Sequence, residues 1–112
     1  MADRNHDLER WLLRGAGGLP TYADQVLARL DHYEEDDGGN SAGWDQDLDQ
    51  LLVEAQEEAA DISGWLLGAA QQLHPAFHGR LVVAMRLAAV VHRELEELRI
   101  LLARDADSDA PQ

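Results

Sequence analysis

Cysteine and lysine are both absent from the 112 residues, and aromatic residues make up only 5% of them. Without cysteine the chain can form no disulfide, no thiolate metal site and no cysteine nucleophile. Positive charge is scarce, since nine arginines stand against 22 acidic residues and the formal net charge is -13. A chain this acidic argues against nucleic acid or an anionic membrane as the partner, because both demand positive charge. The composition favours cations or basic proteins as partners, or serves solubility alone.

Long apolar runs are also missing from the sequence. No stretch approaches the roughly 18 apolar residues that a membrane-spanning helix requires. The opening residues, MADRNHDLERW, lack the apolar core of a signal peptide. We therefore expect a soluble, cytoplasmic protein. Its length predicts a single domain over residues 1–104, followed by a polar, frayed tail at 105–112.

Hydrophobic spacing predicts two short helices in the first third of the chain. Residues 5–14 begin with Asn5, a good helix cap, and are followed by the glycine-rich GAGG. A second helix is expected from about Tyr22 to Glu35, where apolar side chains recur at helical spacing. The run DDGGNSAG then predicts a loop, because it is dense in Gly, Asp, Asn and Ser.

Two long helices are predicted in the rest of the chain. Their apolar residues step by alternating gaps of four and three, the spacing of a helix seam that packs along its length against a partner. The first seam comprises Leu48, Leu52, Ala55, Ala59, Ile62, Leu66, Ala69 and Leu73, and the second comprises Phe77, Leu81, Ala84, Ala88, Val91, Leu95, Leu98 and Leu102. Helices at 45–73 and 77–104, joined by so short a turn, should form an antiparallel hairpin. No segment has the alternation of a strand, so the expected fold class is all-α.

The first half of the last predicted helix is also apolar away from its seam. These residues are Val82, Val83, Met85, Leu87 and Val90. A helix that is apolar on several sides is covered on several sides. We therefore expect the two earlier helices, or another subunit, to cover this one.

Acidic residues crowd the middle of the chain, where no lysine or arginine occurs between Arg29 and Arg80. At about 100° per residue, Glu54, Glu58 and Asp61 point within about 60° of one another on the predicted helix. Like charges three or four residues apart cost about 0.2–0.5 kcal/mol per pair on an exposed helix. A hard divalent cation held by carboxylate oxygens would turn that repulsion into attraction.

The alternative reading of these carboxylates is a solvated helix face, because surface charge of this size is tolerated at little cost. Acidic residues on the second short helix would favour the metal-site hypothesis if their side chains faced Glu54, Glu58 and Asp61. The candidates are Asp31, Glu34 and Glu35.

The segment Glu58-Ala59-Ala60-Asp61, with Trp65 after it, resembles the Glu-x-x-Asp helix motif of the MazG-like all-α nucleoside triphosphate pyrophosphohydrolases. Small members of that superfamily have a Tyr, a Gly-rich loop and a Trp before this helix. The similar residues here are Tyr33, the loop GGNSAG and Trp44. The resemblance covers about residues 30–73.

This resemblance implies an all-helical homodimer or tetramer that depends on Mg²⁺ or Mn²⁺. Glu58 and Asp61 would bind the metal, and Glu54 would be a third ligand or the catalytic base that orients water. Water would attack a nucleoside triphosphate substrate between its α and β phosphorus atoms and release pyrophosphate.

Basic and histidine residues near the predicted site are few. Arg86 and Arg93, seven residues apart on the last helix, are the candidates to contact the outer phosphates, with an ion pair between Arg93 and Glu97 as the alternative. His74 and His78 are four apart, but a proline separates them. We expect them to serve the turn rather than to bind zinc.

Two further functions compete with the enzyme. The chain could be an acidic, all-helical interaction protein, an inhibitor or adaptor that docks on a basic partner without catalytic activity. It could also be a purely structural hairpin that forms oligomers. No motif indicates nucleophilic catalysis or a glycine-rich phosphate loop.

Overall fold

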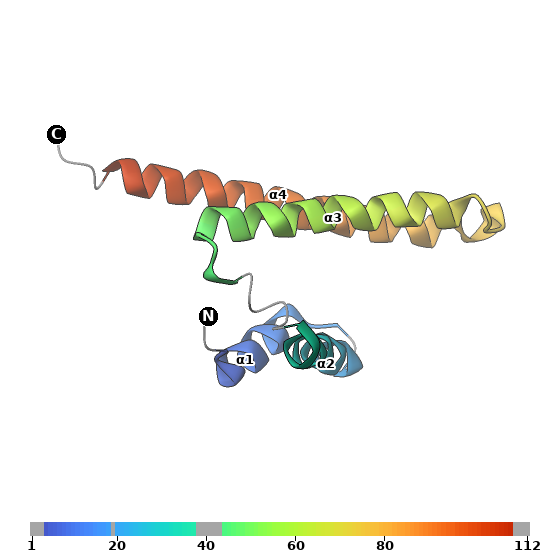
Figure 1. Cartoon of the computed structure of the whole chain (residues 1–112). Coiled ribbons are helices and arrows are strands. Elements are labelled where there is room, and N and C mark those ends of the chain that lie inside the picture. Colours follow the sequence, from blue (N-terminus) through green and yellow to red (C-terminus); the bar gives the residue numbers. More distant parts are fainter. Residues whose placement is uncertain (1–3, 19, 38–43, 109–112) are drawn as a thin grey trace. The chain divides into compact units, whose positions relative to one another are not determined.

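The computed structural model describes residues 4–18, 20–37 and 44–108, and the chain divides into two compact units at Asp47 and Leu48. Four α-helices contain most of these described residues, and no strand occurs among them (Figure 1). The predicted all-α fold class is confirmed. The single domain expected over residues 1–104 stays a prediction, and the two units are described separately.

Two short helices form the first unit. Helix α1 (His6–Ala16) begins after Asn5, whose side-chain oxygen accepts a hydrogen bond of 3.0 Å from the backbone N–H of Leu8, as expected of a cap. It ends at Gly17, whose φ of 79° is open to glycine at no steric cost. Helix α2 (Pro20–Asp37) starts two residues before the predicted Tyr22, because proline at the first helical position has its φ already set.

A nearly buried arginine joins these two helices. The side chain of Arg4 is only 4% exposed, and it forms ion pairs with Glu9 of α1 and Asp31 of α2. Its guanidinium donates two hydrogen bonds to the Glu9 carboxylate. These bonds hold the pKa of Glu9 below its ordinary value. Asp31, which we considered as a carboxylate for the acidic cluster, is therefore engaged within the first unit.

The second unit is the predicted hairpin of two long helices. Helix α3 (Leu48–Ala70) leads through a turn and the short 3-10 helix η2 (Pro75–Phe77) into α4 (His78–Ser108), and α3 and α4 lie side by side (Figure 1). His74 closes the turn, since its Nδ1 accepts a hydrogen bond of 3.0 Å from the N–H of Ala76. The Nε2 of His78 lies 3.1 Å from the carbonyl oxygens of both Ala70 and Leu73. Both histidines serve the turn, as expected.

The ends of the hairpin differ from the predicted helices at 45–73 and 77–104. Helix α3 is shorter at both ends, and at its carboxyl end His78 contacts carbonyl groups that a longer helix would use itself. Helix α4 runs on to Ser108, so residues 105–108 are helical where we expected a frayed tail. Helix-compatible residues continue the last turn there, and the next proline is Pro111. None of the described helices is long and apolar enough to cross a membrane.

Each predicted seam separates into two series of residues seven apart. We call one the middle series, because it lies along the contact between α3 and α4. It comprises Leu52, Ala59, Leu66 and Leu73 together with Leu81, Ala88, Leu95 and Leu102. Its two alanines, at 59 and 88, are the most buried apolar residues of the hairpin, at 4% and 6% exposure. Its leucines are half-buried apart from Leu102, which lies near the free end and is 37% exposed.

The other series stays uncovered, and we call it the open series. It comprises Leu48, Ala55, Ile62 and Ala69 together with Phe77, Ala84, Val91 and Leu98. Its large members remain 41% to 59% exposed, and Ala84 alone is half-buried. The partner helix instead covers residues on the other margin of the middle series, such as Gln56, Ser63 and Ala70, which are buried or half-buried. The hairpin thus uses half of the predicted seam.

Apolar residues of α4 outside both series are also exposed. Val83 and Leu87 are 55% and 61% exposed, and Val82 and Val90 are each 40% exposed. Met85 is half-buried. The hairpin alone does not provide the cover that we expected for them.

Candidate functional site

Four carboxylates lie along the outward side of α3, and we call them the acidic edge: Glu54, Glu57, Glu58 and Asp61. All four are exposed. Ala59 marks the side of α3 that packs on α4, and at about 100° per residue the four carboxylates point about 100° to 160° away from it. The hairpin therefore presents the acidic edge outward and places no residue of α4 against it.

Glu54 and Trp65 show how open this region is. The Oε1 atom of Glu54 accepts a hydrogen bond of 2.9 Å from the side chain of Gln50, one helical turn earlier. Trp65 is 80% exposed. With Asp61 and Gly64 it lines a shallow depression of about 400 Å³. Nothing here encloses a substrate or excludes water.

The carboxylates do not assemble into a metal centre within the described residues. Among the side chains that the structure describes, no three of His, Asp or Glu are placed so that they could share one ion. Glu54, Glu58 and Asp61 share a direction, but they are spread along the helix. The side chains of Glu34 and Glu35, which we considered as further ligands, lie outside the described residues.

The two arginines predicted to contact phosphates are exposed on α4. The guanidinium of Arg93 lies 3.6 Å from the carboxylate of its neighbour Glu94, and no ion pair joins it to Glu97 among the described residues. Arg86 and Arg93 point about 140° to 160° away from Ala88, which marks the side of α4 that packs on α3. Within the hairpin they therefore face away from the acidic edge, and the structure does not bring them together.

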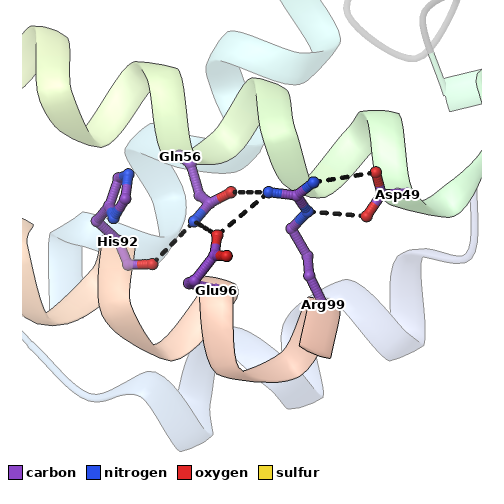
Figure 2. A network of polar contacts seen from close by, with 5 residues as sticks. All are labelled: Asp49, Gln56, His92, Glu96 and Arg99. Carbon is purple, nitrogen blue, oxygen red and sulfur yellow. Dashed lines mark hydrogen bonds and ion pairs between the residues drawn. The ribbon is translucent and has the colours of Figure 1, made fainter. Parts of the chain in front are cut away.

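A polar network that we did not anticipate occupies one side of the contact between α3 and α4 (Figure 2). At its centre is Gln56, which is 5% exposed. Its Nε2 donates hydrogen bonds of 3.1 Å to the carbonyl oxygen of His92 and 2.9 Å to Glu96. Its Oε1 accepts one of 2.9 Å from Arg99. The buried amide is thus fully engaged, as a buried polar group must be to avoid a large penalty.

Arg99 extends the network to the start of α3. Its Nε and Nη2 donate hydrogen bonds of 2.8 and 3.2 Å to the two oxygens of Asp49, a bidentate pair (Figure 2). A third nitrogen, Nη1, lies 3.2 Å from Glu96. Hydrogen bonding to Arg99 lowers the pKa of Asp49, and the same pair raises the pKa of Arg99.

The sequence carries a signal for this network. Asp49 and Gln56 are seven residues apart, as are His92 and Arg99, and each follows a member of the open series by one residue. Its place in the first turn of α3 would by itself explain Asp49. A polar residue beside a seam at heptad spacing would have been the better signal, because such residues often fix helix register.

The comparisons with known proteins find no relative. No protein-family model, curated protein or solved structure matches the chain. The MazG-like resemblance therefore stays a prediction.

Proposed function

We propose that this protein is an acidic, all-helical interaction protein, an inhibitor or adaptor that docks on a basic partner without catalysing a reaction. One observation supports this most: the acidic edge is exposed along the side of α3 that faces away from α4. An outward row of like charges attracts a basic surface at long range and discriminates against acidic ones. The proposed setting is the cytoplasm, because a chain without cysteine needs no oxidising compartment.

Docking fits the described residues better than catalysis does. A general acid, base or metal ligand works best in a site that excludes water and holds several groups together. The acidic edge is open to solvent, and no three ligands of the described residues converge. A docking surface needs neither enclosure nor convergence.

Titration of a lysine-rich peptide into the full chain, at several NaCl concentrations, tests the docking function. The test variant combines Glu54→Gln, Glu58→Gln and Asp61→Asn. We expect it to bind about tenfold more weakly than the wild type at low salt, with the difference shrinking as salt screens the charges.

A second triple variant with the same loss of charge is the control: Glu94→Gln, Glu97→Gln and Asp107→Asn on α4. It should bind the peptide nearly as well as the wild type does. Equal weakening in both variants would mean that net charge alone attracts the peptide, and affinity that salt does not change would mean that charge plays no part. Either result would count against the acidic edge as a docking surface.

The second candidate function is the MazG-like, Mg²⁺-dependent pyrophosphohydrolase of nucleoside triphosphates. The observation in its favour is that Glu54, Glu58 and Asp61 share one exposed side of α3. These three would hold the ion, whose chemistry is to neutralise charge on phosphate oxygens. Since the described residues form no complete ligand set, this candidate needs carboxylates from elsewhere.

Thermal unfolding with and without millimolar MgCl₂ or MnCl₂ tests this second candidate. A magnesium site predicts a higher Tm with the metal, and that increase should vanish in a Glu58→Gln, Asp61→Asn variant that keeps its helix content. We would give up the enzyme if the wild type showed no metal-dependent Tm and released no pyrophosphate from a panel of nucleoside triphosphates.

A further inference from the structure

The open series forms an apolar face along one side of the hairpin. On α3, each of the first three members of this series is followed directly by a residue on the side of the polar network. The pairs are Leu48 and Asp49, Ala55 and Gln56, and Ile62 and Ser63. Consecutive residues of a helix point about 100° apart, so the two sets lie on opposite margins of the contact with α4.

Helix α4 shows the same division. Val91 and Leu98 precede His92 and Arg99, which belong to the polar network. Helices α3 and α4 run antiparallel. The edge of α3 and the edge of α4 that point away from the polar network therefore lie on the same side of the hairpin. One side of the hairpin is thus polar and internally bonded, and the other is apolar and uncovered.

We infer that the open series is the contact face for a second copy of this chain, so that two hairpins form a four-helix bundle. All eight of its residues are apolar, and large ones alternate with alanines along α3. Such alternation lets the side chains of two matching faces interdigitate. A twofold dimer uses the same patch on both copies, which requires a face that complements itself.

The size of this face suits a stable dimer. From Leu48 to Ala69 it runs about 33 Å at 1.5 Å per residue, and two helices side by side are about 20 Å wide, giving a footprint of about 660 Å² per copy. A standard stable interface buries about 800 Å² per partner. The face is therefore about as large as a specific dimer requires.

The other helices of the chain offer no comparable match. Helix α1 has 11 residues, or about 16 Å, which is half the length of the face. The apolar stripe of α2, Ala23, Val26, Leu27 and Leu30, is already half-buried within the first unit. A second α3–α4 hairpin supplies two helices of sufficient length that both carry the same apolar series.

The test measures the mass of the full chain in solution by sedimentation equilibrium across the micromolar range. The wild type should approach twice the 12.4 kDa of one chain. Ile62→Glu places a charge in the proposed contact and should weaken the dimer at least tenfold, or about 1.4 kcal/mol. The matched control is Leu67→Glu, since Leu67 is 55% exposed against 48% for Ile62 but lies outside the open series. It should leave the dimer intact.

Cross-linking tests the same face without a disruptive substitution. Because the chain has no cysteine, a single introduced one reacts alone. Ala55→Cys should give a cross-linked dimer with a short bis-maleimide, whereas Ala60→Cys, also exposed on α3 but outside the open series, should not.

Three results would overturn the inference. A wild type that stays at the mass of one chain would mean that another part of the chain, or a different partner, covers the face. Equal dissociation by Ile62→Glu and Leu67→Glu, with helix content retained, would place the contact elsewhere. Equal cross-linking from both cysteine positions would do the same. The docking function does not depend on this dimer, since a monomer could still bind the peptide through its acidic edge.

Discussion

The two sides of the contact between α3 and α4 are built from neighbouring residues with opposite chemistry. On one side, Gln56 is almost fully buried and bonds to three groups of α4. On the other side, its neighbour Ala55 and the rest of the open series apart from Ala84 are exposed. Residues only one position apart along the helix therefore belong to a fully hydrogen-bonded polar network and to an exposed apolar face.

This difference indicates which interactions define the hairpin and which remain for association. Contacts among the leucines of the middle series would by themselves fix the register only weakly, because leucine recurs along both helices. The Gln56 network tolerates no slip in register, since a shift would leave the amide buried without its partners. The polar side thus specifies one register of the hairpin and leaves the open series on the other side.

Removing the centre of the network should have the largest effect. Gln56→Ala leaves the carbonyl of His92 and the guanidinium of Arg99 without their buried partner. We expect a loss of about 2 kcal/mol in the free energy of unfolding, measured by urea denaturation. Gln50→Ala makes the same substitution at an exposed position of α3 and should cost much less. Equal losses would refute a special role for the polar side.

Enlarging the middle series should have the next largest effect. Ala59 is 4% exposed where α3 packs on α4, so Ala59→Leu has no room without moving the helices apart. Overpacking of this kind costs about 1–3 kcal/mol. Ala60→Leu adds the same atoms at the next, exposed position and should change stability little. If both variants unfold at the same urea concentration, the helices do not pack as closely at Ala59 as we infer.

The smallest effect concerns pH and the outer end of the network. The pKa of Asp49 is lowered in the folded state from an ordinary value of 3.8, so its pairing with Arg99 stabilises the fold above that pH. The contribution is lost as the pH falls through the lower, folded-state pKa. Asp49→Asn should therefore be slightly less stable than the wild type at neutral pH. The difference in the free energy of unfolding between the two proteins should disappear below pH 3.8. Urea denaturation at each pH measures this difference. A difference that does not change with pH would contradict the linkage.

Much of the fold follows from the spacing of apolar residues. The all-α class, the cap at Asn5, the turn at His74 and the antiparallel hairpin were all predicted from the sequence and are present. These features depend on contacts between residues close in sequence or on a period that repeats along one helix. Such information is contained in the sequence itself.

The candidate site could be predicted only in part. The sequence correctly gives Glu54, Glu58 and Asp61 a common direction, because direction on a helix depends only on residue number. It could not show whether other ligands converge on them, because that depends on separate elements meeting in space. Gln56 was missed for a related reason, since a lone glutamine in a helix reveals no partner 36 or 40 residues later.

By itself the sequence determined the helices, the acidic composition and a seam of period three and four on each long helix. The tertiary structure alone decided how each seam is divided, with the middle series against the partner helix and the open series facing outward. The reason is geometric, because two straight helices meet along a line and bury one narrow strip of each. The apolar stripe that the sequence encodes is wider than this strip, and only the packed hairpin reveals which of its residues stay exposed.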